Sequence, residues 1–505
     1  MANDNMDGIH SGRLFAGSCI GLIATAMSFA VMGAIMNSLK AEFLLTNTQV
    51  GWIGGAQLWG FPVSILIFGP LCSTLGMRLL LRLAFLCHAA GVLIMIFAGG
   101  FGTLFMGALT IAFGNGLIEG ACNPLIATLY PDRKTEKLNN FHVWFPGGIV
   151  IGGVFCWLYD KAGIESLAGL SVWQVKLAAI LIPTVIYGAM MFAAKYPRTE
   201  AAQAGVTFGG MMKATLTRPL FLVLFVCMMM TASIELGPGR WIPAILEAGG
   251  MAGILVLCYI NGLMAVLRQF AGPVVAKLSP TGILLGSAIL SGIGLVALSF
   301  TPLNFAVLIP ATVFAIGVCY FWPTMLGVVS ERVPKGGEMA LALMGFAGNV
   351  GVGLITIPLM GGVIDTYAHD KFDVEQTAVV IQHVQEQLPA LKEDESVKYD
   401  EKLVASIDDT VALAASVLEF KAANNALKPV DTANVLRGAI KVKADSAIGQ
   451  EAKKTLDPAE LWGGRVSFRY VACLAIVIFV VFGILYLSDR SRGGYKVEKI
   501  VEEGA

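Results

Sequence analysis

The chain has 505 residues, of which 56% are hydrophobic and only 14% carry a charge. Its 35 basic and 35 acidic residues give a formal net charge of zero. This composition excludes a water-soluble domain of this size and indicates a protein built for a lipid surrounding.

Apolar runs of 18 or more residues recur along the chain. A helix of about 20 residues crosses the roughly 30 Å of hydrocarbon in a bilayer. The alternating segments of about ten residues that mark a membrane β-barrel are not found. We therefore predict an all-α membrane protein with twelve transmembrane helices, at 13–39, 48–72, 79–99, 103–130, 141–159, 172–194, 218–246, 251–277, 281–300, 303–329, 338–365 and 464–488.

The short loops predict the orientation, because Lys and Arg concentrate on the cytoplasmic side. Most of them fall on the side of the two chain ends, for example Arg82, Lys134 and Arg332, so we expect both termini to face the cytoplasm. The polar segment 366–462 lies on the other side. It is either a small, mostly helical extracytoplasmic insertion or a partly ordered spacer without a ligand of its own.

Two landmarks repeat at nearly one offset. Gly69-Pro70 at the end of the second run matches Gly272-Pro273, 203 residues later. The fourth run ends with Pro124 and then Asp132-Arg133, and the tenth ends with Pro323 and then Glu331-Arg332, 199 residues later. Because these landmarks lie six spans apart, they indicate a duplicated six-helix unit and thus the major facilitator fold.

The expected organisation has five parts. They are an N-terminal six-helix half at 1–200, a cytoplasmic linker at 201–217, helices 7 to 11 of the C-terminal half at 218–365, the insertion at 366–462, and helix 12 with a cytoplasmic tail at 463–505.

Glu119 lies near the middle of the fourth run, in GNGLIEGACNP. A charged group at mid-membrane costs about 2.5–3.5 kcal/mol on insertion scales, so it is kept mainly where it meets a cavity, an ion or a partner. Asn115 and Asn123 stand one turn before and after it on the same face. The stripe predicts a proton site beside hydrogen-bonding groups for a polar solute; the alternative is a carboxylate satisfied by a neighbouring helix.

Glu235 lies in the seventh run, within TASIELGPGRW. Gly237 and Pro238 interrupt the helix just after it, and interrupted helices in transporters line binding cavities. Glu235 is therefore a candidate for a coupling role, and the alternative is neutralisation by Arg240 at the outer surface.

In the eighth run, Asn261 and Arg268 are seven residues apart and share a face. Arg268 is either a counter-ion for the solute or a carboxylate, or an anchor at the inner interface. Amides and aromatic rings suit a cavity that binds a sugar. The remaining candidates for such a lining are Asn37, Gln57, Trp59, Trp144, Trp241, Tyr320, Trp322 and Asn349.

Motifs for other chemistry are not found in the sequence. It contains no GxxxxGK[ST] nucleotide motif, its five histidines have no ligand spacing, and no nucleophile and base stand at a recognisable spacing. We therefore expect neither an enzyme nor a bound metal or cofactor, and we expect an ion gradient as the energy source.

A family resemblance rests on several of these stretches. The chain reads EGACNP at Glu119–Pro124, followed by LIATLYP and KLNNFH, with LRQFAG from Leu267 and FWPT from Phe321. In these stretches it resembles the fucose-galactose-glucose proton symporters, the fucose permease group of the major facilitator superfamily. The resemblance covers all the spans but not the insertion.

The resemblance implies proton-coupled sugar uptake. Glu119 matches the membrane-embedded glutamate of that family, and Asn123, Glu235 and Arg268 match its other polar landmarks. The chain departs from the family in its fifth span, where His142 and Phe145 replace a glutamine and an asparagine.

Two further departures concern acidic residues. The first span has no acid and offers only Gly33 and Asn37, whereas fucose permease carries an aspartate there. After the second span, Ser73 and Thr74 stand in place of the usual acidic and basic pair.

Together these features predict a secondary active transporter in the cell membrane, of the bacterial inner-membrane kind, that takes up a monosaccharide or similar solute with protons by alternating access. Its partners are then the solute, protons and lipid, not nucleic acid. The alternatives are an exporter or exchanger of a non-sugar solute, and a transporter-like sensor that uses 366–462.

The candidate residues are Glu119 and Glu235 for proton coupling, Gln57, Asn115, Asn123, Asn261, Asn349, Trp144 and Trp322 for the solute, and Asn37, His142 and Arg268 for gating or as counter-ions.

Overall fold

The computed structural model describes residues 8–43, 45, 47–164, 166–248, 253–302, 304–393 and 401–500. Within these ranges eleven helices are long and apolar enough to cross a membrane, and a shorter apolar helix covers Leu255–Gln269. These twelve segments follow the twelve predicted spans in order. The expected all-α membrane protein is confirmed.

The first half of the chain contains six of these spans and one small hairpin. Its strands, β1 and β2, pair antiparallel with Ser166 opposite Ser171. Its elements are α1 (Ser11–Glu42), α2 (Asn47–Phe68), α3 (Cys72–Leu75), α4 (Met77–Ile96), α5 (Phe101–Leu129), α6 (Lys134–His142), α7 (Trp144–Lys161), β1 (Ser166–Leu167), β2 (Leu170–Ser171), α8 (Val172–Ala178) and α9 (Leu181–Met191).

The connection and the second half follow. They comprise α10 (Glu200–Gln203), α11 (Phe208–Leu216), α12 (Pro219–Ala248), α13 (Gly253–Gln269), α14 (Ala271–Phe300), η1 (Phe305–Val307), α15 (Leu308–Val318), α16 (Phe321–Arg332), η2 (Pro334–Gly336), α17 (Gly337–Val350), the π-helical turn η3 (Gly351–Thr356) and α18 (Ile357–Ala368). The last segments are η4 (His369–Lys371), α19 (Val374–Gln387), η5 (Leu388–Glu393), α20 (Glu401–Asn424), α21 (Pro429–Val442) and α22 (Ala447–Ser491).

The eighth span ends earlier than the sequence predicts. The prediction extends it to residue 277, whereas α13 ends at Gln269 and α14 starts at Ala271. The predicted break before residue 281 is present as a kink inside α14 at Ser279, where φ is 62°. Pro280 follows, and a proline disfavours the helical conformation of the residue before it.

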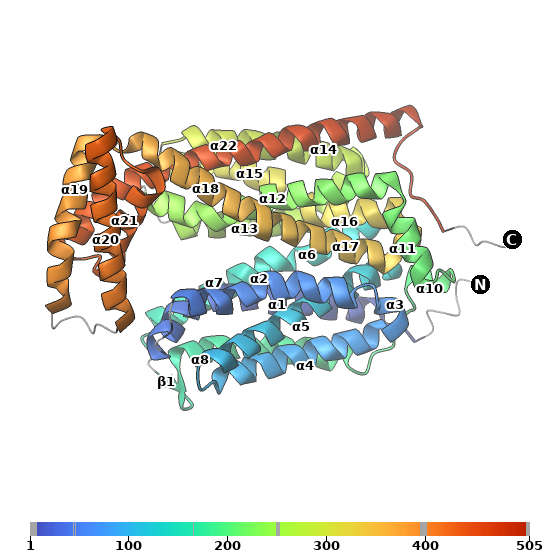
Figure 1. Cartoon of the computed structure of the whole chain (residues 1–505). Coiled ribbons are helices and arrows are strands. Elements are labelled where there is room, and N and C mark those ends of the chain that lie inside the picture. The colour runs from blue at the N-terminus through green and yellow to red at the C-terminus, as the bar shows by residue number, and fades with distance from the viewer. Residues whose placement is uncertain are drawn as a thin grey trace.

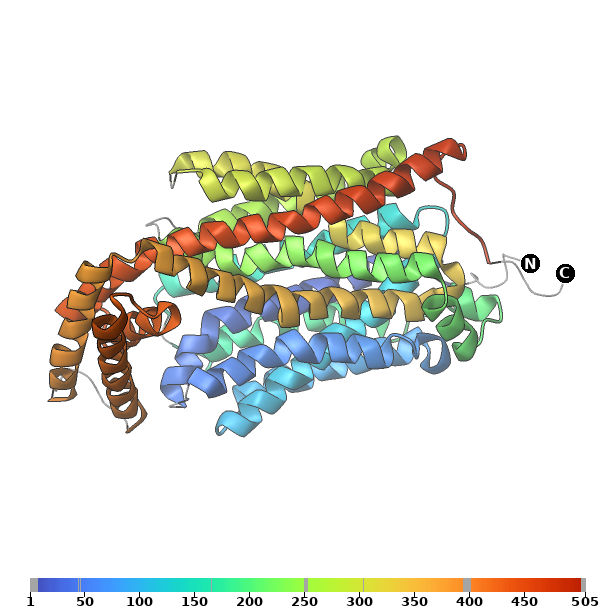
Figure 2. The ribbon, with the colours of Figure 1, turned by 45° about the horizontal axis from the view of Figure 1, so that its top comes forward.

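The two halves lie side by side, with the N-terminal half in blue and cyan and the C-terminal half in green to red (Figure 1). Both described ends of the chain lie at one end of the bundle, near α10 and α11, and α19–α21 project beyond the opposite end (Figures 1 and 2). We call these the terminal end and the insertion end. An even number of crossings follows from this placement.

Glycines let equivalent helix pairs approach closely in both halves. A Cβ on Gly91 of α4 would lie 2.8 Å from the backbone nitrogen of Ile111 in α5. A Cβ on Gly294 of α14 would lie 2.5 Å from the backbone nitrogen of Phe314 in α15. Small residues at such crossings are typical of membrane helices, where packing replaces the hydrophobic effect. The α4–α5 and α14–α15 pairs are thus the same structural unit used twice.

Residues 374–459 form a helical bundle with a hydrophobic core of its own. Ile381, Leu436 and Ala452 are fully buried in it, on α19, α21 and α22. Arg437 links this bundle to α18, since its Nη2 donates to Asp365 Oδ1 at 2.7 Å. The bundle therefore has its own fold and a fixed attachment to the transmembrane part.

We expect Leu436→Ala to loosen this bundle without disturbing the membrane spans. Truncating a fully buried leucine leaves a cavity and costs about 2–5 kcal/mol. Limited trypsin digestion of the full chain should then cut the 374–459 region faster, while the transmembrane part stays intact. The exposed substitution Val430→Ala, at 46% exposure, is the matched control. Equal digestion of all three proteins would contradict the independent core.

Candidate functional site

A chain of buried polar groups crosses the middle of the protein. It runs from Glu119 and Asn123 on α5 through His142 at the end of α6 to Arg268 on α13 and Glu235 on α12. All five side chains are buried. The first three come from the N-terminal half and the last two from the C-terminal half, so the chain of contacts bridges the halves.

Arg268 holds this network together. Its Nη2 donates to Glu235 Oε1 at 2.7 Å, its Nη1 donates to the backbone carbonyl of His142 at 3.0 Å, and its Nε donates to the backbone carbonyl of Cys319. The side chain is only 2% exposed. A guanidinium buried in hydrocarbon needs such a complete set of acceptors. All three nitrogens are therefore occupied, and one of their bonds crosses between the halves.

Among the residues that the structure describes, Glu119 has no ion-pair partner, unlike Glu235. Its Oε2 is buried without a hydrogen-bond partner in the described residues. The Asn123 amide and the positive charge of Arg268 act on the carboxyl. Next to Glu119 the helix packs closely on the segment after α2, since a Cβ on Gly120 would lie 3.3 Å from the Cα of Gly69. The site thus contains one carboxylate fixed by a guanidinium and one that is not.

His142 is the partner of Asn123. Its Nε2 lies 3.1 Å from Asn123 Oδ1, and its ring stacks edge-on against Phe141. Because Asn123 Oδ1 accepts, the Nε2 of His142 carries the proton in this pair. His142 therefore connects the two halves. Its ring donates a hydrogen bond to Asn123 in its own half, and its backbone carbonyl accepts one from Arg268 in the C-terminal half.

Asn115 stands one turn before Glu119 on α5, but its hydrogen bonds go to other residues. Its Oδ1 lies 2.9 Å from His88 Nε2, and its Nδ2 donates to Ser28 Oγ at 2.9 Å. His88 continues to the Tyr187 hydroxyl at 3.0 Å. Gln57 donates to the Ser28 carbonyl at 3.3 Å. Two predicted solute ligands thus belong to a hydrogen-bond network within the N-terminal half.

The other predicted solute ligands lie on helices of the C-terminal half or at its boundary. Asn261 and Asn349 are half-buried, and each donates to a carbonyl one turn earlier in its own helix. Trp322 is buried against Gly348, and its indole Nε1 has no partner in the described residues. Trp144 is 36% exposed. Asn261 and Asn349 keep amide oxygens for which the described residues show no hydrogen bond.

Two sequence-based interpretations involve side chains outside the described part of the structure. They are Asn37 as a gating residue and Arg240 as the neutralising partner of Glu235. Glu235 pairs with Arg268.

An aromatic cluster lies beside the polar network and was missed in the sequence. Phe29 on α1 contacts Phe61 on α2 at a ring distance of 6.0 Å and Phe145 on α7 at 6.1 Å. A phenylalanine in an apolar run gives no signal that separates packing from a cavity wall. Only the helix arrangement shows that these three rings meet.

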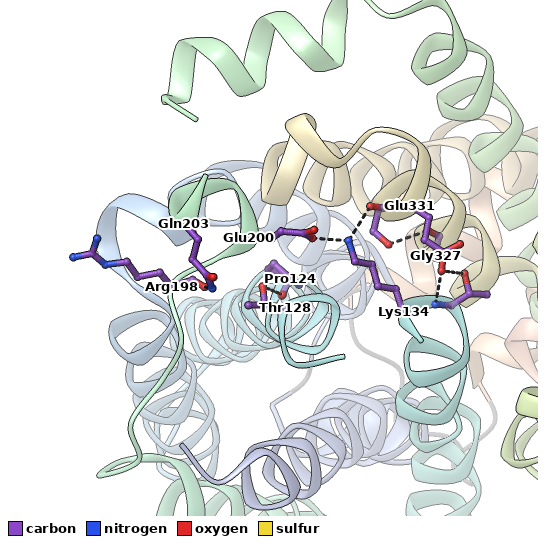
Figure 3. A network of polar contacts seen from close by, with 10 residues as sticks. Pro124, Thr128, Lys134, Arg198, Glu200, Gln203, Gly327 and Glu331 are labelled. Carbon is purple, nitrogen blue, oxygen red and sulfur yellow. Dashed lines mark hydrogen bonds and ion pairs between the residues drawn. The ribbon is translucent and has the colours of Figure 1, made fainter. Parts of the chain in front are cut away.

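Polar contacts join the halves at the terminal end (Figure 3). Glu331 Oε1 on α16 accepts from the backbone nitrogen and the hydroxyl of Thr135 on α6, at 3.1 and 2.8 Å. Lys134 Nζ, which is almost fully buried, donates to Glu200 Oε2 at 2.5 Å and to the Ser330 carbonyl at 3.3 Å. These bonds close the terminal end between α6 and α16.

The C-terminal tail reinforces the same contact. The Tyr495 hydroxyl donates to Glu331 Oε2 at 2.7 Å, and the Arg332 guanidinium lies 4.3 Å from the Tyr495 ring centre. Burial, together with the negative charge of Glu331, raises the pKa of Tyr495 well above its usual range. Glu498 pairs with Arg218 at 2.6 Å. The tail thus bonds to the carboxylate that joins the halves.

Comparisons with known proteins agree with this architecture. The family model of the Major Facilitator Superfamily matches residues 18–356. The chain therefore belongs to the Major Facilitator Superfamily and is a transporter of that class. Solved structures share the fold, among them the proton:xylose symporter XylE from E. coli, with 14% identity, a TM-score of 0.61 and coverage of 70% of this chain and 89% of that one.

Two further structures are similar. The fucose transporter FucP from E. coli, in its outward conformation, has 17% identity and a TM-score of 0.58, over 70% of this chain and 92% of that one. A bacterial homologue of the human lysosomal transporter Spinster has 12% identity and a TM-score of 0.57, over 96% and 97%. At these identities the likeness concerns the fold alone.

Relatives found by sequence match only in part. The 4-hydroxybenzoate transporter PcaK of Acinetobacter baylyi is 25% identical over 159 residues, which is 30% of this chain and 34% of that protein. An MFS-type transporter of Bacillus subtilis, YhcA, is 25% identical over 117 residues, 23% of this chain and 22% of that protein. The chain thus matches about a third or less of either relative's length.

We predict that Gly327→Ala weakens the closure at the terminal end. A Cβ there would clash with the Thr135 hydroxyl and lie 2.8 Å from the Thr135 Cα, so α6 and α16 must separate. Hydrogen exchange of these two helices should become faster. Gly286→Ala on α14, where a Cβ meets no atom within 4 Å, should leave exchange unchanged. Equal exchange in both variants would argue against a contact that holds the halves.

We also predict strong coupling between Glu235 and Arg268. Removing one partner of a buried ion pair costs about 3–5 kcal/mol, because it leaves the other charge uncompensated. Glu235→Gln and Arg268→Gln should each lower the melting temperature in detergent. The double variant should lose clearly less than the sum of the single losses. Additive losses would show that the two groups do not act as a pair.

Proposed function

We propose that this transporter takes up a neutral polar solute, a monosaccharide or similar polyol, together with protons by alternating access. The observation that carries this proposal is that only one of the two buried carboxyls has an ion-pair partner. Glu235 has a guanidinium at 2.7 Å, whereas Glu119 has no ion-pair partner among the described residues; each of the two carboxyls keeps one buried oxygen without a hydrogen bond there.

The charges of the site support proton coupling. Glu235 and Arg268 cancel each other, so the net charge of the network depends on Glu119 alone. When Glu119 is protonated, the network carries no net charge, so the site can change conformation within a low-dielectric interior. When Glu119 is ionised, the network carries a net negative charge there. Glu119 would bind a proton before the conformational change and release this proton afterwards. The two steps would couple solute movement to the proton gradient.

The same charges favour a neutral solute over an anion. An organic anion is the second candidate, because one relative is named as a 4-hydroxybenzoate transporter. Arg268 is the cation in the network, and each of its nitrogens already has an acceptor. Glu235 already neutralises its charge, so an anionic solute would bring an uncompensated negative charge into the site. A hydroxyl-rich solute brings no charge and can bond to the amide groups.

We assign the solute to the space between the halves. Asn123, Asn261 and Asn349 supply amides, with Gln57 at the N-terminal side. Trp322 and Trp144 supply rings for the apolar face of a sugar. Asn115 has both amide groups occupied and is assigned to holding α5 in place.

We further propose that the terminal end faces the cytoplasm of a bacterial inner membrane. The short loops on that side carry most of the Lys and Arg, in line with the positive-inside rule. The contacts through Glu331 and Thr135 would then close the inner side, and the 374–459 bundle would lie outside.

Uptake into proteoliposomes tests the proposal. The substrates are labelled monosaccharides and 4-hydroxybenzoate, each with and without an inward proton gradient. Glu119→Gln should lose gradient-driven accumulation at least tenfold yet keep solute exchange at equilibrium, because the side chain then stays neutral. Uptake by the wild type should fall as the outside pH rises, since fewer carriers are protonated.

Glu419→Gln, an exposed carboxyl on α20, is the matched control and should transport normally. Gradient-driven accumulation that persists in Glu119→Gln would refute the role of Glu119. Uptake of 4-hydroxybenzoate but of no sugar would refute the proposed solute class. The role of Glu119 in proton coupling would then be tested with the same variants and 4-hydroxybenzoate as the substrate.

A further inference from the structure

Three cationic side chains gather where α22 enters the transmembrane bundle. Lys371 Nζ lies 4.6 Å and the Arg469 guanidinium 5.2 Å from the centre of the Trp462 ring. Arg465 stands one turn before Arg469 on α22, and the two charges act on each other. We call Lys371, Arg465 and Arg469 the α22 cation cluster.

The α22 cation cluster has no counter-ion in the described part of the chain. None of its members has a carboxylate within 4 Å among the residues that the structure describes. The nearby Arg437 differs, because it bridges Asp365 and Glu460 at 2.7 Å each. Adjacent like charges repel each other, so an unneutralised group of three indicates an anion from outside the chain.

Neutral groups fix the positions of the two arginines. Arg465 Nη2 donates to the carbonyl of Thr301 at 2.7 Å, and Arg469 Nε donates to Ser299 Oγ at 3.1 Å. The Arg469 guanidinium also lies 4.1 Å from the Phe300 ring centre. Both Nη groups of Arg469 remain without an acceptor in the described part of the chain. The fork that binds phosphate bidentately is thus held in place and unused.

The surroundings place the α22 cation cluster at the boundary of the membrane. Helix α14 ends at Phe300, which is 65% exposed, and Phe305 just beyond is 89% exposed. Tyr470, next to Arg469, is 52% exposed. Exposed aromatic rings beside basic groups are typical of the level of lipid headgroups. Basic pockets at this level bind anionic headgroups.

We propose that the α22 cation cluster binds the headgroup phosphate of an anionic phospholipid in the leaflet at the insertion end. The phosphate would contact Arg469 and Arg465, with Lys371 above the Trp462 ring, and the acyl chains would lie along α14 near Phe300. The lipid would fasten the junction of the 374–459 bundle, α22 and α14. This proposal is independent of the solute and of proton coupling.

Native mass spectrometry of the full chain in detergent tests it, with phosphatidylglycerol and phosphatidylcholine as probes. The wild type should retain phosphatidylglycerol at least fivefold better than phosphatidylcholine. Arg465→Gln/Arg469→Gln should lose this preference, and Arg465→Lys/Arg469→Lys, which keeps the charges, should keep most of it. Arg490→Gln, on the same helix at the other end, is the matched control and should behave like the wild type.

An unchanged preference in the double glutamine variant would overturn the proposal. So would an equal loss in Arg490→Gln, because general charge attraction would then explain the binding. A second experiment compares the melting temperature of the protein with inorganic phosphate and with phosphatidylglycerol. If millimolar phosphate stabilises the protein as much as phosphatidylglycerol does, a lipid is not the source of the bound phosphate group. If the glutamine variant fails to fold, Lys371→Gln should still lower phosphatidylglycerol retention at least twofold.

Discussion

The buried pair of Arg268 and Glu235 is the interaction on which the central part of the protein depends. A lone charge in the bilayer interior is expensive, so Arg268 must find acceptors for each of its nitrogens. It finds them on α12, at the junction of α15 and α16, and on the carbonyl of His142 in the other half. One requirement of solvation thus brings three segments from both halves together around Arg268.

The contacts at the terminal end complete this arrangement. Glu331 bonds to Thr135 in the other half and to Tyr495 in the tail. These bonds must break if the terminal end opens, whereas the close α4–α5 and α14–α15 packing within each half can stay intact. In the proposed mechanism the contacts that join the halves at the terminal end would be the ones that break, and the close packing within each half would persist. This division suits a mechanism in which two halves rock around a shared central site.

The sequence was sufficient for the spans and the two-half fold, because hydropathy and repeated landmarks are local features. It also located two carboxyls that the structure buries, and their roles stay predictions. It left Arg268 between a counter-ion and an interface anchor, since spacing within α13 cannot reveal that α12 lies beside it. Asn115 shows a second limit of the sequence, which gives the helix face of a residue but not its partners. Asn115 lies on the same face of α5 as Glu119, yet it bonds to His88 and Ser28. The kink at Ser279 and the contact between Tyr495 and Glu331 likewise depend on tertiary packing. Such pairings become visible only when helices far apart in sequence are placed together.

The central claim is that Glu119 carries the coupled proton while Glu235 stays paired with Arg268. The most direct measurement follows the pH outside weakly buffered, de-energised vesicles when the transported solute is added. Our account predicts alkalinisation of the medium by the wild type, as protons enter with the solute, and none by Glu119→Gln although solute still equilibrates. Alkalinisation that persists in Glu119→Gln would contradict the account and shift the proton to another group.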